Sequence, residues 1–344
     1  MPKTNRQWLL KARPAAMPSE ADFELAETPV PEPGPGQFVM RASVLSVDPY
    51  MRGRMRDVKS YVPPVQIGEV MTGASVGAVV ASRHPDFKEG DIVEGRFGWQ
   101  DYARSDGRDA GARKVDPSLA PISTALGVLG MPGMTAYFGL TEVGQPKEGE
   151  TVVVSAASGA VGGLVGQIAR IKGCRAVGIA GGPQKCAYVK DELGMDAAID
   201  HRKARDLEAM TAALGEAAPD GVDVYFDNVG GMTLDAVLAR INLHARIAIC
   251  GMISEYNQAE LELAPRPTRA LLVQRARMQG LIVFDWLKRY PEGMAQMAAW
   301  IKEGRIKYRE DVLDGIENMP KAMLRLFSGE NFGKQLVRAA PDPA

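Results

Sequence analysis

The segment from Thr151 to Gly166 reads T-V-V-V-S-A-A-S-G-A-V-G-G-L-V-G. Its first four residues are β-branched, which is typical of a strand that is buried on both faces of a parallel sheet. Small residues follow, and an apolar stripe at Val161, Val165 and Ile168 then has the spacing of a helix. Strand, tight turn and helix in this order form the first βα unit of a dinucleotide-binding fold, in which the start of the helix approaches a pyrophosphate.

The turn in this segment carries the pattern Ala157-x-Gly159-x-x-Gly162, with alanine in place of the first glycine. Small residues at these positions also serve the ordinary packing of a helix on a strand, so the pattern alone is weak evidence. It gains weight from its position, because it directly follows a predicted strand and opens a predicted helix. We therefore interpret it as a cofactor site.

Strands and helices continue to alternate after this unit, which predicts a doubly wound parallel sheet covered by helices. A further helix, from Gly130 to about Val143, precedes the unit. The other predicted elements are strands at 176–180, 197–199, 222–226, 246–250 and 280–283, and helices at 162–172, 184–193, about 205–214 and 233–241.

The part of the chain before this α/β region is rich in glycine, proline and short β-patterns. Alternating apolar residues at 38–44 predict a half-buried strand, and further strands are expected at 68–80 and 91–97. These features predict a small β-barrel. We expect a final strand at 333–337 to return to this barrel, and so we predict one domain from 1–127 and 300–344, with a nucleotide-binding domain at 128–299 inserted into it.

The composition is that of an ordinary globular protein, with 46% hydrophobic and 24% charged residues and a formal net charge of −1. Such a charge argues against a general nucleic-acid or membrane-surface binder. No apolar run reaches the ~20 residues that span a bilayer, and the first residues lack the apolar core of a signal peptide. The three cysteines, Cys174, Cys186 and Cys250, form no disulfide framework, so we expect a cytoplasmic protein.

The end of the second predicted strand indicates which cofactor binds. Proteins selective for NAD usually place an acid there, but residues 177–182 read V-G-I-A-G-G. Lys185 follows, and His201-Arg202-Lys203 comes directly after the third strand. Cations at this edge of the sheet favour the 2′-phosphate of NADPH, although such residues also occur simply as solvated surface charges. The missing acid and the second cationic cluster lead us to predict NADPH.

Metal ligands are scarce in this chain. The only histidines are His84, His201 and His244, and the first 150 residues contain no cysteine. Neither a catalytic zinc site with thiolates nor a four-cysteine structural site can be assembled, so we predict that no metal is used. Hydride transfer without a metal Lewis acid fits addition to an activated C=C bond, where hydrogen-bond donors stabilise the enolate that forms.

Two tyrosines are candidate donors to such an enolate. Tyr256 follows the fifth strand of the predicted sheet, in a loop that would pass near the nicotinamide. Tyr50 follows a strand of the first domain and could face the cleft. The alternative for each is a half-buried tyrosine whose hydroxyl bonds only to the backbone.

Three motifs together are specific: D-P-Y-M-R at 48–52, G-M-P-G-M-T-A-Y at 130–137 and F-D-N-V-G-G at 226–231. In these and other stretches along nearly its whole length, the chain resembles the zinc-free medium-chain dehydrogenases/reductases of the prostaglandin reductase and 2-alkenal reductase group. The similarity is greatest to bacterial NADPH-dependent curcumin reductases. The resemblance implies a GroES-like β-barrel domain plus a Rossmann domain, a homodimer, and NADPH-dependent reduction of a small α,β-unsaturated ketone or aldehyde.

The resemblance also implies roles for individual residues. Tyr256 matches the tyrosine that stabilises the enolate, Lys185 matches a contact to the 2′-phosphate, and His201 stands where many relatives have tyrosine. The other positions that match cofactor-binding stretches are Thr135, Gly159, Ala160, Val161, Gly162, Gly181, Asn228, Cys250, Gly251, Met252, Ile253, Ser254, Leu281, Ile282, Val283 and Asn331.

Two alternatives to an enone reductase remain open at this stage. One is a quinone reductase or a zinc-free alcohol dehydrogenase on the same scaffold. The other is a non-catalytic protein that binds NADPH for structural or regulatory reasons. An assay that compares enones, quinones and alcohols separates these three hypotheses.

Overall fold

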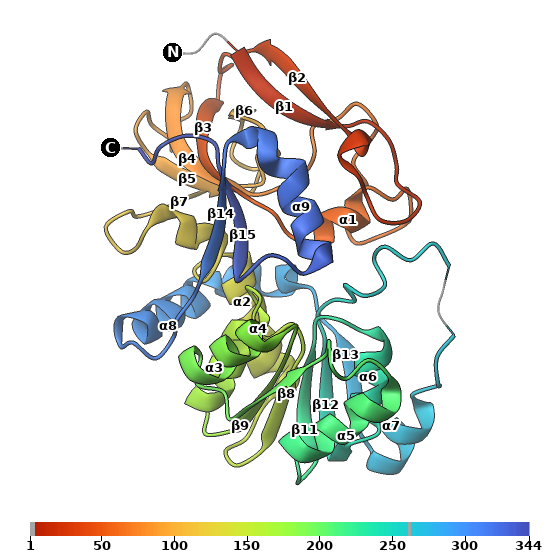
Figure 1. The fold of residues 1–344 in the computed structure, drawn as a ribbon. Helices are drawn as coiled ribbons and strands as arrows, with labels where there is room; N and C mark the ends of the chain where they lie inside the picture. Colours follow the sequence, from red (N-terminus) through yellow and green to blue (C-terminus); the bar gives the residue numbers. More distant parts are fainter. Residues whose placement is uncertain (1–3, 261–262, 344) are drawn as a thin grey trace. The chain divides into compact units, whose positions relative to one another are not determined.

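The computed structural model describes residues 4–260 and 263–343. Contacts divide the chain into two compact units, Met1–Leu126 with Glu310–Ala344, and Gly127–Arg309 (Figure 1). The chain re-enters the first unit at Glu310, which is later than the predicted boundary between residues 299 and 300. The reason is a contact within the second unit: the side chain of Gln167 donates to the backbone oxygen of Lys307 over 2.9 Å and accepts from its N–H over 2.8 Å.

The second unit is built on a six-stranded sheet in the order β10-β9-β8-β11-β12-β13, in which all neighbouring strands are parallel. Its strands are β8 (Thr151–Val154), β9 (Arg175–Ala180), β10 (Ala197–Asp200), β11 (Val222–Asp227), β12 (Ile241–Ile249) and β13 (Arg277–Gly280). This is the strand order of a doubly wound dinucleotide-binding sheet, and the direction of winding switches between β8 and β11. The predicted parallel sheet is confirmed, but the strand predicted at 280–283 is wrong, because β13 ends where that strand was expected to begin.

Helices cover both faces of this sheet (Figure 1). Helices α5 and α6 bury Met210 and Val237 in one cluster with strand residues such as Val153 and Ile247, and Leu271 of α7 packs against this cluster while partly buried. The helices of this unit are α2 (Met131–Phe138), α3 (Gly162–Ile171), α4 (Pro183–Ala187), α5 (Leu207–Ala217), α6 (Gly231–Leu238), α7 (Thr268–Gln274) and α8 (Tyr290–Lys302). The predicted helices at 130–143 and 184–193 each begin as α-helix and continue as π-helical turns, η3 (Gly139–Gly144) and η4 (Tyr188–Glu192).

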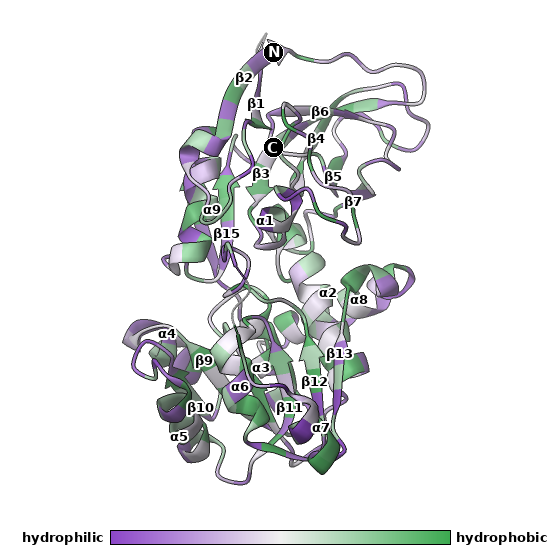
Figure 2. Ribbon diagram, turned by 90° about the vertical axis from the view of Figure 1, so that its right-hand side faces the viewer, coloured by the Kyte–Doolittle hydropathy of each residue, from purple (hydrophilic) through white to green (hydrophobic). Residues whose placement is uncertain are grey.

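Strand β8 lies in the middle of the sheet, between β9 and β11. Val152, Val153 and Val154 are all fully buried, which explains the unbroken β-branched run in the sequence. Figure 2 shows hydrophobic colour along the strands of this sheet. The turn after β8 is therefore held by a rigid strand.

The closest packing in that turn occurs at Gly162. A Cβ atom on this residue would lie 2.4 Å from the carbonyl oxygen of Ala156, which itself has a left-handed φ of 50°. We expect Gly162→Ala to lower the free energy of unfolding by about 2 kcal/mol, because backbone atoms cannot move aside as a flexible side chain can. Guanidinium denaturation measures the change. Gly53→Ala is the matched control, since a Cβ there meets nothing within 4 Å, and equal stability of the two variants would contradict the prediction.

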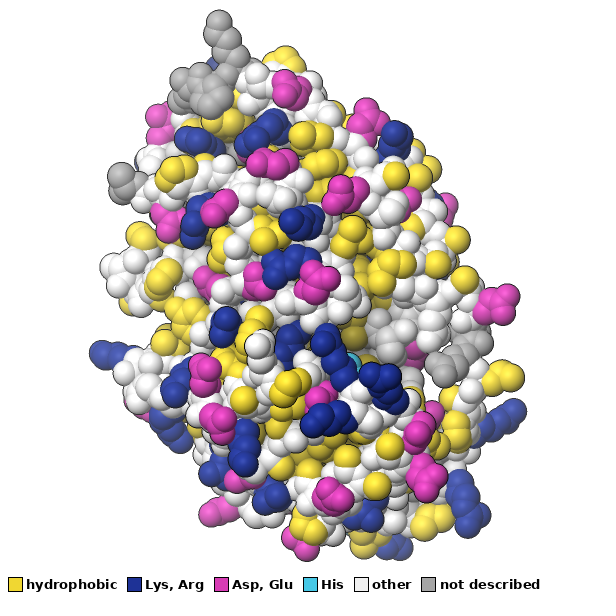
Figure 3. Space-filling view, viewed as in Figure 1, with side chains coloured by type: hydrophobic (Ala, Val, Ile, Leu, Met, Phe, Trp, Pro, Cys, Tyr) yellow, Lys and Arg dark blue, Asp and Glu magenta, His cyan; other side chains and the backbone are white. Residues whose placement is uncertain are grey.

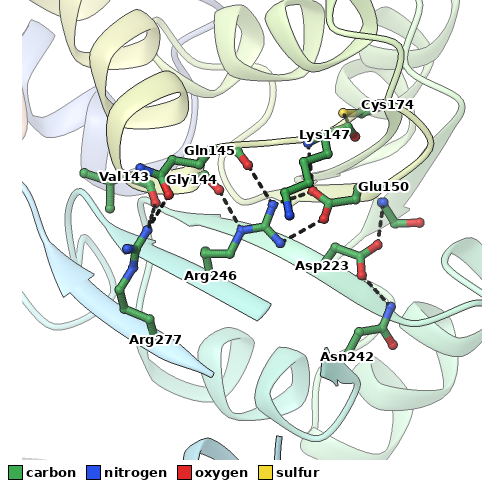
Figure 4. A network of polar contacts seen from close by, with 11 residues as sticks. Val143, Gly144, Gln145, Lys147, Glu150, Cys174, Asp223, Asn242, Arg246 and Arg277 are labelled. Atoms are coloured by element: carbon green, nitrogen blue, oxygen red, sulfur yellow. Dashed lines mark hydrogen bonds and ion pairs between the residues drawn. The ribbon is translucent and has the colours of Figure 1, made fainter. Parts of the chain in front are cut away.

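A polar network at the opposite ends of the strands fixes where β8 begins (Figure 4). Arg246 of β12 donates to the backbone oxygen of Gly144 over 3.0 Å and pairs with Glu150. Arg277 of β13 donates to the backbone oxygen of Val143 over 2.8 Å. Asp223 of β11 accepts the N–H of the first β8 residue over 2.8 Å. Because ligands of doubly wound sheets bind at the carboxyl ends of the strands, we assign this network a structural role.

The first unit contains a seven-stranded mixed sheet in the order β14-β15-β3-β4-β5-β7, with β6 also paired to β3, and a separate pair β1-β2. The bounds are β1 (Thr4–Leu10), β2 (Phe23–Pro29), β3 (Phe38–Ser46), α1 (Tyr50–Arg54), β4 (Ser75–Ser82), β5 (Ile92–Gly95), β6 (Tyr102–Ser105), β7 (Arg113–Lys114), β14 (Glu310–Asp314), α9 (Met319–Ser328) and β15 (Lys334–Arg338). The strand predicted at 333–337 is β15, which pairs antiparallel with β3. Across the part of the chain that the structure describes, no helix combines the length and apolar character needed to cross a membrane.

A buried ion pair fixes the segment of this unit that carries Tyr50. The ammonium of Lys334 lies 2.8 Å from Asp48 Oδ1 and donates to the backbone oxygen of Val47, also over 2.8 Å. Only 4% of the lysine side chain and 7% of the aspartate side chain are exposed. Removing either partner would leave an uncompensated buried charge, so the pair ties β15 firmly to the turn between β3 and α1.

Candidate active site

The carboxyl ends of β8 and β11 are joined by hydrogen bonds at the point where the winding of the sheet reverses. Ser155 Oγ accepts the backbone N–H of Asn228 over 2.8 Å. The side-chain amide of Asn228 donates to the backbone oxygen of Ser155, also over 2.8 Å. Asn228 is thus held against the turn that follows β8. In doubly wound sheets this is where dinucleotides bind.

Asp227 organises this junction, a role that sequence analysis missed. Its Oδ1 accepts from Ser155 Oγ over 3.1 Å, from the Tyr225 hydroxyl over 2.8 Å, and from the backbone N–H groups of Val229 and Gly230 over 2.9 Å each. The side chain is fully buried, and this burial is the main cause that raises the pKa of Asp227. The small residues that follow Asp227 in F-D-N-V-G-G are the sequence signal for this role, because a turn that wraps tightly around a carboxylate requires small residues.

The glycine turn lies next to Asn228 at the start of α3. Gly159, Ala160 and Val161 are half-buried, whereas Gly162 is buried under the carbonyl of Ala156. A helix start of small residues at the switch point lets the backbone come close to a phosphate. These residues fit the pyrophosphate of a dinucleotide.

A basic edge lies where β9 ends. The position that a Cβ of Gly181 would occupy is 2.7 Å from Nε2 of His201 and 3.3 Å from Nε of Arg202. The charge of Lys185, on α4, also acts on His201. Figure 3 shows several Lys and Arg side chains gathered on the face that it draws. Asp200 Oδ1, at the end of β10, accepts the N–H of Gly182 over 2.8 Å. The basic side chains of Lys185, His201 and Arg202 fit a 2′-phosphate.

The loop after β12 carries Tyr256 and is fastened to the segment that follows β11. Cys250 N–H donates to the backbone oxygen of Asp227 over 2.8 Å, and Ser254 donates to the backbone oxygen of Val229. The Tyr256 hydroxyl accepts the N–H of Met252 over 3.2 Å. A tyrosine hydroxyl can accept one hydrogen bond and donate another.

Other predicted site residues of the second unit differ in how deeply they are buried. Thr135, on α2, is buried, and its hydroxyl donates to the backbone oxygen of Met131 over 2.7 Å. Leu281 and Val283 are buried, while Ile282 between them is half-buried. These three residues follow β13 and do not form the strand that was predicted. Their proposed contacts to the cofactor stay predictions.

Two predicted site residues, Tyr50 and Asn331, belong to the first unit. Tyr50 begins α1, with the guanidinium of Arg54 6.0 Å from its ring centre. Burial is the main cause that raises its pKa, and the charge of Asp48 adds to the shift. The side-chain amide of Asn331 donates to the backbone oxygen of Gly333 over 3.1 Å. Neither contact by itself defines a role toward a ligand.

Titratable side chains suited to a metal are dispersed. Within residues 4–260 and 263–343, no three or more His, Cys, Asp or Glu side chains come together as a metal ion would require. The prediction that the protein uses no metal remains a prediction from its composition.

Two family models match this chain. Residues 6–113 match the model described as the N-terminal domain of oxidoreductase, and residues 160–302 match the model described as zinc-binding dehydrogenase. The second description names a metal for which the described side chains offer no cluster.

Similar proteins span nearly the whole chain. The chain is 48% identical to the NADPH-dependent curcumin reductase of Escherichia coli (strain K12), over 98% of both chains. It is 44% identical to the NADP(+)-dependent 2-alkenal reductase of Nicotiana tabacum, over 97% of both. The crystal structure of CurA from Vibrio vulnificus in complex with NADPH superposes with a TM-score of 0.92 at 47% identity, covering 98% of this chain and 99% of that one. These matches confirm the predicted fold class, a GroES-like domain with a Rossmann domain.

Proposed function

The chain belongs to the zinc-free medium-chain dehydrogenases/reductases of the curcumin, 2-alkenal and prostaglandin reductase group, and we propose on that basis that it reduces the C=C bond of α,β-unsaturated ketones and aldehydes with NADPH. The observation that carries this proposal is the full-length similarity to two enzymes whose names state reduction of a conjugated carbonyl compound. The glycine turn and the basic edge support the cofactor assignment.

The bound cofactor supplies the hydride that adds to the β-carbon of the substrate. The chain holds it with the backbone of residues 159–162 at the pyrophosphate and with Lys185 and its basic neighbours at the 2′-phosphate. Tyr256 donates its hydroxyl hydrogen to the substrate carbonyl oxygen as negative charge develops there. The α-carbon then takes a proton from solvent or through a relay.

Tyr50 is the second candidate donor. Its hydroxyl is protonated at neutral pH, as that of any tyrosine whose pKa is not lowered, and can donate a hydrogen bond; burial raises this pKa further. The Asp48–Lys334 pair supports this role, because it fixes the turn from which α1 begins.

We also propose that the protein is a homodimer formed at the outer edge of β13. This strand is last in the order of the described sheet, and a second copy can pair with its unused backbone groups. On the preceding helix α7, Leu272 is 78% exposed and Val273 is 60% exposed, which gives such an interface apolar surface. Light scattering coupled to size-exclusion chromatography tests this assignment.

A cytoplasmic location is a further proposal, supported by the cysteines. Cys174, Cys186 and Cys250 all carry free thiols. Burial is the main cause that raises the pKa of Cys174 to about 11 and that of Cys250 to about 12, so both stay protonated and unreactive. Free thiols are usual in a reducing compartment.

The deciding experiment follows the absorbance of NADPH in the presence of different acceptors. We expect oxidation of NADPH by an enone and an enal, and none by the saturated ketone with the same carbon skeleton, since that ketone lacks the C=C bond. Preference for a quinone, or for an alcohol with NADP⁺, would replace this proposal with one of the related oxidoreductase hypotheses. Tight binding of NADPH without oxidation by any acceptor would favour the non-catalytic hypothesis.

A further inference from the structure

We propose that this protein takes up a proton at His201 when it binds the 2′-phosphate of its cofactor, so that its preference for the phosphorylated cofactor weakens as the pH rises. The inference rests on the proposed use of NADPH and adds a regulatory property to that site. It depends on the geometry of the loop after β9 and on the charges that surround His201.

The imidazole lies directly against the backbone where the 2′-phosphate is expected. Its Nε2 is 2.7 Å from the position that a Cβ of Gly181 would occupy, so it sits where a side chain at the end of β9 would otherwise be. That end of the second strand is where doubly wound folds contact the adenosine ribose. The absence of a side chain on Gly181 therefore makes room for the histidine ring at this point.

The turn that carries His201 is fastened to the loop after β9. Asp200 Oδ1 accepts the N–H of Gly182 over 2.8 Å and that of Arg202 over 3.0 Å. The N–H of His201 donates to the backbone oxygen of Ala180 over 3.1 Å. One carboxylate thus joins the ends of β9 and β10 and holds the ring and the guanidinium on the same side of Gly181. The position of His201 is set by the fold.

Three charged groups act on the imidazole: Asp200 from the end of β10, Arg202 from the same turn, and Lys185 from α4. Although His201 retains exposed surface, the surrounding loop desolvates its ring, and this is the main cause that lowers its pKa. Asp200 opposes this shift, whereas the cations Arg202 and Lys185 add to it. Without a ligand, the ring is therefore mostly neutral above the ordinary histidine value of about 6.5.

A bound 2′-phosphate reverses the electrostatic balance at His201. A phosphate monoester is mainly dianionic above its second pKa of about 6, and an opposite charge at close range favours the protonated imidazole. Between the pKa values of the free and bound states, binding is accompanied by proton uptake. One such proton lowers the affinity by at most about tenfold for each unit of rising pH. Arg202 and Lys185, whose positive charges act on the imidazole, add attraction for the phosphate that does not involve His201.

Isothermal titration calorimetry of the full chain with adenosine 2′,5′-bisphosphate tests the proposal without any turnover. Titrations at pH 7.5 in buffers of different ionisation enthalpy count the protons taken up, and titrations from pH 7.0 to 8.5 give the pH dependence of the affinity. The variants are His201→Asn and, as a matched control, His244→Asn. His244 lies exposed on β12 with a left-handed φ of 63°, a conformation that asparagine adopts readily.

We expect the wild type and His244→Asn to take up a measurable fraction of one proton and to lose several-fold in affinity for each pH unit. His201→Asn should take up none, and its affinity should be nearly constant over this range. Equal proton uptake in His201→Asn and the wild type would overturn this inference and leave the proposed use of NADPH standing. If the bisphosphate binds the wild type no more tightly than 5′-AMP does, the proposed use of NADPH fails and the inference fails with it.

Discussion

Replacing Tyr256 with phenylalanine is expected to slow the turnover of an enone about a hundredfold or more, because a single oxyanion donor contributes about 3 kcal/mol to the transition state. The phenyl ring keeps the packing of the loop and loses only the hydroxyl. That hydroxyl accepts the N–H of Met252 over 3.2 Å, and a phenolic hydroxyl that accepts one hydrogen bond can also donate one. The measurement is kcat from NADPH absorbance, with NADPH binding followed by fluorescence, which should change little.

Tyr188→Phe is the control for this experiment. Tyr188 is a buried tyrosine in η4 of the same unit, where its ring lies 5.9 Å from the guanidinium carbon of Arg309, and it has no place in the candidate site. Its variant should retain wild-type turnover. Unchanged kcat in Tyr256→Phe would show that Tyr256 is not the donor and would direct attention to the ribose hydroxyls of the cofactor. A larger loss in Tyr50→Phe than in Tyr256→Phe would assign the main donor role to Tyr50.

The parts of the fold that sequence predicted best are those buried on both sides. The β-branched run of β8 and the small residues after it have few compatible conformations, so both the strand and the start of α3 were identified. Strand β13 was misplaced for the opposite reason. It reads R-M-Q-G and is mostly exposed at the edge of the sheet, so its sequence lacks the apolar signature of a core strand. The apolar residues at 281–283 that follow it carry that signature instead, although they lie beyond the strand.

The candidate site was predictable where a side chain follows directly from a strand end. Lys185, His201 and Tyr256 follow the second, third and fifth strands of the sheet, and these positions mark them as candidates in the sequence. Asp227 and Asp200 were missed, because both use their carboxylates on backbone N–H groups. Sequence does not distinguish a carboxylate that binds a ligand from one that ties two loops together. The partners of these acids become apparent only in the folded chain.

Replacing Lys185 with alanine is expected to raise KM for NADPH about ten- to a hundredfold and to leave KM for NADH nearly unchanged. Removing one charge-assisted hydrogen bond to phosphate costs about 1.5–3 kcal/mol, and NADH lacks the group that receives it. Lys185 is half-buried on α4, and its charge acts on His201, which places the ammonium near the basic edge. Steady-state kinetics with each cofactor at saturating enone give the two values.

Lys190→Ala is the matched control, since Lys190 is an exposed lysine on the next turn of the same helical segment. Its substitution should change neither KM. Equal changes of KM for NADPH and NADH in Lys185→Ala would instead indicate a structural lysine, because a contact to the 2′-phosphate acts on only one of the two cofactors. Selectivity would then have to come from Arg202 and His201, the two side chains that lie against Gly181. The ratio of the two KM values therefore reports on the phosphate contact separately from the integrity of the fold.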